Sequence, residues 1–284
     1  MEKKERKTGM IVAYYPGCSL EGVAREYDRS ARLVCDRLGF GLQEVPDWNC
    51  CGATAAHSLN HELTRGLSAR NLAIVERMNL ATVTTPCPGC SIRLKGAAME
   101  AKKESGAPEV MHLLQLLTEA AGTEKIASSV IKPLGGLRLA AYYGCLVTRP
   151  RAVARFDDPE QPRSMDRILQ ALGAETVDWS HKAECCGGAF AASETSIVVD
   201  LGGQVLEAAR QAGAEALAVA CPMCQVNLDT RQWEVESTRG VRYDLPVFYF
   251  TQLMGLAYGF TNRAMGLKRL LVNPLPLLKR KGIL

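Results

Sequence analysis

Apolar and polar positions along this chain follow one order of segments that occurs twice. Short apolar runs rich in β-branched and aromatic residues occupy residues 9–15 and 137–143, and both predict buried strands. A segment with helical spacing of apolar residues follows in each copy, at 31–38 and 164–172. A glycine stands directly after each segment, where helices commonly end. Both copies therefore begin with a strand and a helix.

The rest of each copy continues this alternation. A second strand, a long amphipathic helix and a third strand are predicted at residues 42–45, 61–78 and 81–85 in the first copy and at 175–177, 194–212 and 216–220 in the second. Strands that alternate with helices are typical of a parallel sheet with crossover helices. The predicted fold class is α/β, with two tandem pseudo-repeat domains of Rossmann-like form. Functional groups of such domains gather at the carboxyl ends of the strands.

The copies suggest where the chain divides. We expect a first domain over residues 1–130 and a second over 131–284, which ends in a helical extension. A proline and paired glycines predict a linker within 121–136. The second copy has an insertion within 149–162, which contains Arg149, Arg151 and Arg155. These arginines either meet an anionic substrate or acidic partner or are simply solvated.

Composition narrows the class of protein. The chain has 284 residues, of which 47% are hydrophobic, enough for two domain cores. A net charge of +4 and 6% aromatic residues argue against a nucleic-acid partner, and the basic tail at 279–281 is read as a solvated end. No apolar run is long enough for a membrane span, and the charged start does not resemble a signal peptide. We expect a cytoplasmic protein.

Cysteine is the residue that carries the repeated chemistry. Ten of the eleven cysteines form one pattern written twice, a single Cys, then Cys-Cys-Gly, then Cys-Pro-x-Cys: Cys18, Cys50, Cys51, Cys87 and Cys90, and again Cys145, Cys185, Cys186, Cys221 and Cys224. In a reducing cytosol such spacings are more often metal or redox sites than disulfides. Each copy is thus predicted to carry a five-cysteine site.

Three kinds of site remain open from the residues alone. A structural zinc ion takes four ligands, which would leave one thiol of each copy over. Cys-Pro-x-Cys is also typical of dithiol oxidoreductases, but those need only two cysteines. Iron-sulfur clusters take several thiolates, and a simple cubane uses four. Five thiols in each copy therefore favour a cluster of altered geometry, without proving it.

These motifs resemble the cysteine-rich CCG domain, and their duplication resembles the B subunits of heterodisulfide reductases. The resemblance covers nearly the whole chain, including residues 156–159 and 251–256. It implies two noncubane [4Fe-4S] clusters, with one cluster plus zinc as the alternative. The implied ligands are Cys18, Cys50, Cys51, Cys87 and Cys90 for the first and Cys145, Cys185, Cys186, Cys221 and Cys224 for the second. No ligand position departs from the pattern of the family.

The same resemblance implies a function. The chain would be the catalytic subunit of a heterodisulfide reductase-like complex, an oxidoreductase that splits a small-molecule or protein disulfide by two one-electron steps through these cysteine-bound clusters. Electrons would come from a small iron-sulfur protein resembling the C subunits of that family, which is fed by a flavin-containing protein resembling its A subunits. The alternatives are an electron-relay subunit without a disulfide substrate and a zinc protein with a structural or regulatory role.

Other residues receive narrower expectations. Cys35 has no counterpart in the second copy and is expected to be a buried helical residue. His57 and His181 lie near the paired cysteines and could give a proton to a leaving thiolate. Neither they nor the other two histidines, His61 and His112, have metal-ligand spacing. Three glycines are expected to let the backbone approach a cluster or to form an ordinary turn: Gly52, Gly187 and Gly188.

Overall fold

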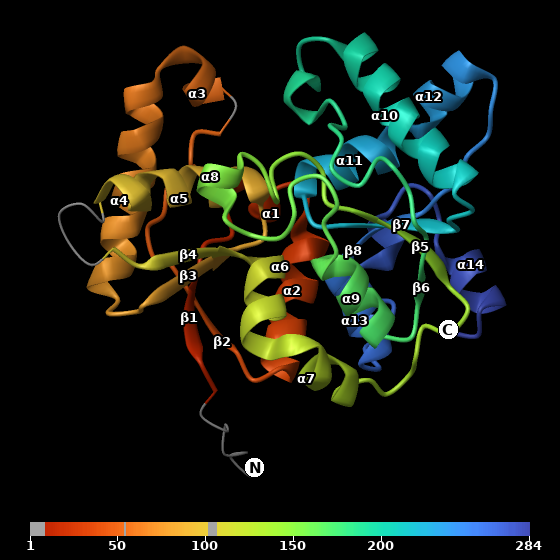
Figure 1. Ribbon diagram of the computed structural model, residues 1–284, viewed down its shortest axis with the longest axis horizontal. Helices are drawn as coiled ribbons and strands as arrows, with labels where there is room; N and C mark the ends of the chain where they lie inside the picture. The colour runs from red at the N-terminus through yellow and green to blue at the C-terminus, as the bar shows by residue number, and fades with distance from the viewer. Residues whose placement is uncertain (1–8, 54, 102–106) are drawn as a thin grey trace.

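Two four-stranded parallel sheets form the centre of the molecule (Figure 1). The computed structural model describes residues 9–53, 55–101 and 107–284. The first sheet has the order β2-β1-β3-β4, and the second repeats it as β6-β5-β7-β8. The strands are β1 (Ile11–Tyr14), β2 (Gly41–Glu44), β3 (Thr82–Thr85), β4 (Glu109–His112), β5 (Arg138–Tyr142), β6 (Glu175–Thr176), β7 (Ala216–Val219) and β8 (Val247–Tyr249). The predicted α/β class with two tandem repeats is confirmed.

The helices of the first repeat form the crossovers between its strands, and those after β4 lead to the second repeat. They are α1 (Cys18–Glu21), α2 (Arg25–Arg37), α3 (Ala55–Leu59), α4 (His61–Arg77), α5 (Pro88–Ala101), α6 (Leu113–Leu116), a π-helical turn at Leu117–Ala121, and α7 (Gly122–Ser128). Helices cover the sheets, so all four residues of β3 and all four of β7 are buried. The side chain of Asn60 begins α4 by accepting a hydrogen bond from the N–H of Leu63 at 3.0 Å.

The second repeat has a matching set with additions. Its helices are α8 (Arg151–Ala154), α9 (Ser164–Ala171), a 3₁₀ turn at Gly188–Phe190, α10 (Thr195–Gln211), α11 (Pro222–Thr230), α12 (Gln232–Arg239), α13 (Phe250–Ala257), a 3₁₀ turn at Leu267–Arg269, and α14 (Leu275–Arg280). Among the described residues, no helix is both long and apolar enough to cross a bilayer.

The repeats are joined by the packing of α2 against α13, which lie side by side in Figure 1. Tyr27 stacks on Tyr249 with ring centroids 4.1 Å apart, and both side chains are fully buried. The hydroxyl groups of Ser30 and Thr251 lie 2.7 Å apart beside them. The first repeat is therefore held to the C-terminal extension by a continuous buried contact.

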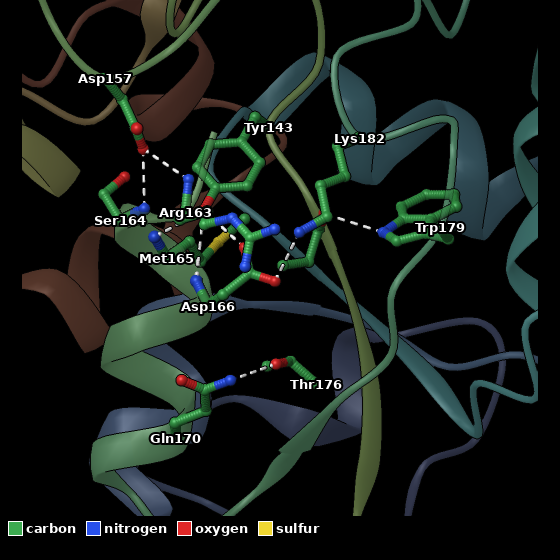
Figure 2. A network of polar contacts seen from close by, with 11 residues as sticks. Tyr143, Asp157, Arg163, Ser164, Met165, Asp166, Gln170, Thr176, Trp179 and Lys182 are labelled. Carbon is green, nitrogen blue, oxygen red and sulfur yellow. Dashed lines mark hydrogen bonds and ion pairs between the residues drawn. The ribbon is translucent and has the colours of Figure 1, made fainter. Parts of the chain in front are cut away.

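The insertion of the second repeat is folded onto the protein. The carboxylate of Asp157 accepts hydrogen bonds from the N–H groups of Arg163 and Ser164 at the start of α9 (Figure 2). Lys95 of the first repeat donates from its Nζ to the carbonyl of Ala154 at the end of α8. Arg149 bonds within the protein, to the Pro159 carbonyl at 2.9 Å and the Glu160 carboxylate at 2.7 Å. The insertion is thus a bridge between the repeats.

The structure adds an element to two sequence-based expectations. The predicted linker contains a helix, α7, whose Ile126 is fully buried. The sequence predicts three strands in the first copy, and the structure adds β4, which pairs with β3. With its fourth strand the first sheet matches the second.

Candidate metal centres

Each group of five cysteines comes from three elements of one repeat. In the first, Cys18 opens α1 after β1, the Cys50–Cys51 pair follows β2, and Cys87 and Cys90 lie at the start of α5 after β3. These three strands are parallel neighbours, so their carboxyl ends meet at one edge of the sheet. The second repeat places its cysteines after β5, β6 and β7 in the same way.

The sulfur atoms of the first repeat form one connected group. Cys50 Sγ lies 3.8 Å from Cys18 Sγ, and Cys51 Sγ lies 3.1 Å from Cys90 Sγ. Hydrogen bonds between the side chains of Cys50 and Cys51 and of Cys87 and Cys90 complete the chain of contacts. The structure therefore brings together all five thiols that the sequence singles out in this repeat.

The second repeat has sulfur contacts of the same kind, in a group of three cysteines and a pair. Cys186 Sγ lies 3.4 Å from Cys224 Sγ. Cys145 is hydrogen-bonded to Cys185, and Cys221 to Cys224. Gly187 donates its N–H to Cys185 Sγ at 3.3 Å, as Gly52 does to Cys50 Sγ at 3.5 Å.

Each site has a buried side and an accessible side. Cys51, Cys87 and Cys90 are buried, whereas Cys18 and Cys50 are exposed. In the second repeat Cys186 and Cys224 are buried and the other three are half-buried. A group bound by these thiols would be shielded on one side and accessible from the other.

In one hydrogen-bonded pair of cysteines in each repeat, the pKa of one thiol is lowered toward the thiolate and the pKa of its partner is raised. The hydrogen bond from Cys50 lowers the pKa of Cys51 to about 3, and the hydrogen bond from Cys145 lowers the pKa of Cys185 to about 6. The pKa of Cys186 is also lowered, chiefly by its hydrogen bond with Cys224. Thiolate is the form of cysteine that binds metal. The donor set of both repeats therefore fits a soft metal group such as an iron-sulfur cluster.

A glycine leaves room for the sulfurs in each site. Gly17 and Gly144 both have positive φ, +72° and +67°. A Cβ at Gly17 would lie 3.0 Å from Cys90 Sγ, and one at Gly144 would lie 3.0 Å from Cys224 Sγ. Both glycines directly precede the first cysteine of a copy, which was an unused signal in the sequence.

The three glycines named from the sequence divide into two kinds. A Cβ at Gly52 would meet Leu67 at 3.1 Å, and one at Gly187 would meet the Cα of Val198 at 2.9 Å, so both pack against helices. A Cβ at Gly188 would lie 3.5 Å from Cys186 Sγ. Of the three, Gly188 is the one at which a Cβ would lie within 4 Å of a sulfur, whereas Gly52 and Gly187 meet a sulfur through their backbone N–H groups.

A tyrosine anchors the Cys-Cys loop in both repeats. The hydroxyl of Tyr15 donates to the carbonyl of Asn49, the residue before Cys50, at 2.7 Å. Tyr142 donates to the carbonyl of Glu184, the residue before Cys185, also at 2.7 Å. Sequence reasoning missed this role, although each tyrosine stands three positions before the first cysteine of its copy.

The hydrogen-bond partners of the histidines in the described residues are groups other than the thiols. His57 Nδ1 lies 3.1 Å from His61 Nδ1, and burial together with the Arg93 charge lowers the pKa of His57. His181 Nδ1 lies 2.8 Å from the hydroxyl of its neighbour Ser180. Within the part of the chain that the structure describes, no hydrogen bond places His57 or His181 on a cysteine sulfur.

His112 has a role that the sequence did not suggest. It is buried between the repeats, and its Nε2 lies 2.8 Å from the carbonyl of Pro86 and 3.1 Å from that of Ala220. These residues directly precede Cys87 and Cys221. Burial lowers the pKa of His112 to about 4, so its ring is neutral at pH 7 and Nε2 carries the donated proton. His112 thus ties one cysteine loop of each site together.

Other features of the described chain lie outside the two thiol groups. Cys35 is buried in α2, as predicted, and burial raises its pKa to about 12. In residues 9–53, 55–101 and 107–284, no group of three or more His, Cys, Asp or Glu side chains is arranged to hold a single metal ion. A pocket of about 700 Å³ lies beside α12 and the C-terminal segment, and its lining includes Trp233 but no cysteine.

Comparison with known proteins places these sites in context. The family model "Cysteine-rich domain" (CCG) matches residues 12–95 and 139–229, which together make up more than half of the chain. Each match contains all five cysteines of its repeat.

Two relatives match almost end to end. The 8-methylmenaquinol:fumarate reductase membrane anchor subunit of Wolinella succinogenes is 32% identical, over 90% of this chain and 94% of its own. The B subunit of the ferredoxin:CoB-CoM heterodisulfide reductase of Methanosarcina mazei is 28% identical, over 91% and 92%.

A solved structure shares the fold. A hypothetical protein from Helicobacter pylori superposes with a TM-score of 0.70 and 12% identity, over 91% of this chain and 51% of its own. At that identity the likeness concerns the fold alone.

Proposed function

The chain belongs to the family with a duplicated cysteine-rich CCG domain, and from this premise we propose that each five-thiol site binds one noncubane [4Fe-4S] cluster. As a member it is a redox iron-sulfur protein, related to subunits of multi-subunit reductases. The proposed ligands are Cys18, Cys50, Cys51, Cys87 and Cys90 for the first cluster and Cys145, Cys185, Cys186, Cys221 and Cys224 for the second. The boundary between the domains is proposed at residue 130.

The observation that carries this proposal is the gathering of five thiols at the carboxyl ends of three neighbouring parallel strands in each repeat. A cubane needs four cysteines, so the fifth thiol, at the same place in both copies, supports a cluster of a different shape. The lowered pKa of Cys51 and of Cys185 supports metal binding near neutral pH. The glycines Gly17 and Gly144 leave space beside a sulfur in both sites.

We further propose that the protein reduces a disulfide. Splitting a disulfide consumes two electrons and two protons and yields two thiols. When bound, iron-sulfur clusters supply electrons one at a time, so two sites match a two-electron reaction. The exposed Cys18 and Cys50 mark the side from which a small-molecule or protein disulfide would approach. The buried Cys51, Cys87 and Cys90 keep water from the other side.

Side chains of this protein hold the cysteine loops in place. Tyr15 and Tyr142 fix the Cys-Cys loops, and His112 fixes the cysteine loops of both sites relative to each other. The proposed electron donors are a small iron-sulfur protein like the C subunits of heterodisulfide reductases and a flavin-containing protein like their A subunits. A cytoplasmic location is proposed because cysteines in regular spacings are more often metal or redox sites than disulfides in a reducing compartment.

A second function has a specific observation in its favour. The relative with 32% identity is named as a subunit of a quinol:fumarate reductase, whose name includes no disulfide. The same two sites would then pass electrons between other subunits of a redox complex. In this alternative the exposed side of the first site faces a partner instead of a substrate.

The deciding experiment has two stages. Iron, acid-labile sulfide and zinc are first measured per chain on protein purified without oxygen, and about eight irons with matching sulfide are expected for two four-iron clusters. The reduced protein is then mixed with a heterodisulfide such as CoM-S-S-CoB or with other low-molecular-weight disulfides. Reoxidation with release of two thiols supports the reductase. Full iron without reoxidation by any disulfide supports the relay, and zinc in place of iron contradicts both.

A further inference from the structure

The two sites differ in the charge carried by the helix that follows Cys-Pro-x-Cys. Helices α5 and α11 both begin at the proline of this motif. Three residues after the last cysteine, α5 carries Arg93 and α11 carries Asn227. Three residues are almost one helical turn, so each side chain lies near the face that holds the cysteine.

Geometry relates both residues to the buried cysteine of the Cys-Cys pair, by a direct contact in the second site and through Cys90 in the first. Asn227 Nδ2 lies 3.5 Å from the carbonyl oxygen and 3.9 Å from the Sγ of Cys186. Arg93 lies almost one helical turn after Cys90 in α5, and Cys90 Sγ lies 3.1 Å from the Sγ of Cys51, the matching cysteine of the first site. A half-buried guanidinium therefore occupies in the first site the place that a neutral amide has in the second.

At two further matched positions the first site again has the residue with the more positive charge. Five residues after the last cysteine, α5 carries the buried Lys95, which bonds to Gln115 and to the carbonyl of Ala154. At the matching place α11 carries the buried Asp229, whose carboxylate accepts from two backbone N–H groups. Before the Cys-Cys pair, the first site has the neutral Asn49 and the second has Glu184.

Cations near the second site are neutralised. Lys182 forms a buried ion pair with Asp166 at 2.7 Å, as Figure 2 shows. The guanidinium groups of Arg149 and Arg231 are paired with Glu160 and Glu234. Within the described ranges Arg93 and Lys95 form no ion pair with a carboxylate. The carboxylates of Glu119 and Glu109 act on the charge of Lys95, so Arg93 is the cation of the two whose charge has no acidic neighbour among the described residues.

We propose that the first-repeat site has the higher reduction potential of the two, and that Arg93 is the positioning residue that sets this difference. The inference rests on the proposed function, because both sites must bind clusters. Reduction adds negative charge, so a nearby uncompensated cation stabilises the reduced state. The greater exposure of Cys18 and Cys50 acts in the same direction. The first site is then reduced first when an iron-sulfur partner gives up single electrons.

The test is a redox titration of the anaerobically purified chain, followed by electron paramagnetic resonance, with iron and sulfide measured on every sample. Arg93→Gln is expected to weaken reduction of the first site about tenfold, which is about 59 mV for one electron. Arg93→Lys keeps the charge and is expected to keep the wild-type potential. Asn227→Arg is the matched control and is expected to strengthen reduction of the second site by a similar factor. The titration is repeated in the Cys186→Ala variant, which is expected to lack the second cluster. The resonance signal that remains then belongs to the first site.

The outcomes separate this inference from the proposed function. Full iron with an unchanged first-site potential in Arg93→Gln overturns the inference and leaves the clusters in place. An equal shift in Arg93→Lys also overturns it, because packing rather than charge would then be responsible. A wild type without iron and sulfide contradicts the proposed function, and the inference falls with it.

Discussion

Both repeats hold the Cys-Cys loop with a tyrosine hydroxyl, and both leave space for a sulfur with a glycine of positive φ. Tyr15 and Gly17 do this in the first repeat, and Tyr142 and Gly144 do it in the second. The surroundings differ, because the first site is more exposed and has Arg93 where the second has Asn227. The comparison indicates that the shared residues hold the sites and the differing residues make them unequal.

The second repeat also carries the parts that join the molecule. Its insertion reaches Lys95 of the first repeat, and its C-terminal extension packs on α2. Asp229, which matches Lys95 in position, binds the N–H groups of Leu271 and Val272 in that extension. The matched helices α5 and α11 thus carry opposite charges at the same position. One charge binds the insertion and the other binds the C-terminal extension.

Removal of one cysteine of the Cys-Cys pair is the strongest way to test the equivalence of the sites. Cys51→Ala and Cys186→Ala are each expected to lose one cluster, which halves the iron per chain, and to abolish disulfide reduction. The reason is that each buried thiol is a proposed ligand of one site only. Cys35→Ser, in the buried α2 position, is the control and is expected to keep full iron. Full activity in either alanine variant would contradict the two-cluster proposal.

Much of this comparison was accessible from the sequence, because the cysteine spacing and the strand periodicity are local and repeated. Strand β4 was missed because its four residues, Glu109 to His112, have no clear alternation of apolar and polar side chains. The roles of Lys95 and His112 were missed for another reason. Their partners, Ala154 and Ala220, lie far away in sequence and are brought close only by packing of the two repeats.

The free energy of unfolding should also depend differently on two tyrosine–aspartate hydrogen bonds, one in each repeat. Tyr143 donates to Asp166, which also pairs with Lys182, and the side chains of this ion pair are 9% and 5% exposed. Asp166→Asn leaves a buried charge and is expected to lower the free energy of unfolding by about 3–5 kcal/mol. Tyr14 donates to Asp28, whose carboxylate is 26% exposed, so Asp28→Asn is expected to cost about 1 kcal/mol or less. Anaerobic urea denaturation measures both, and equal costs would contradict the difference in burial.

The residue at the end of the fourth strand differs between the two sheets. This difference predicts that one repeat adds a pH dependence to the free energy of unfolding that the other does not add. His112 ends β4, whereas Tyr249 ends β8. The pKa of His112 is lowered by burial to about 4, below its unfolded value of about 6.5. The unfolded chain therefore binds the extra proton first, and stability is lost as pH falls below about 6.5. Between pH 7 and 5 this loss is about 2 kcal/mol.

His112→Gln should remove that part of the pH dependence. Denaturation at pH 7 and pH 5 measures the slope in the wild type and the variant. His57→Gln is the control, because His57 is not packed between the repeats. If His57→Gln flattened the slope as much as His112→Gln does, the burial of His112 would be excluded as the origin of the pH dependence.

The smallest expected effect concerns the shared tyrosines. Tyr15→Phe and Tyr142→Phe each remove one hydrogen bond to the carbonyl before a Cys-Cys pair, which is expected to cost about 1 kcal/mol of unfolding free energy. Tyr258→Phe is the matched control, since the buried hydroxyl of Tyr258 has no hydrogen-bond partner within the described residues. Removal of the Tyr258 hydroxyl should leave the free energy of unfolding unchanged or raise it slightly, because no hydrogen bond is broken. Equal costs in the two repeats would support a common framework, whereas a cost in only one would mean that the loops are held differently.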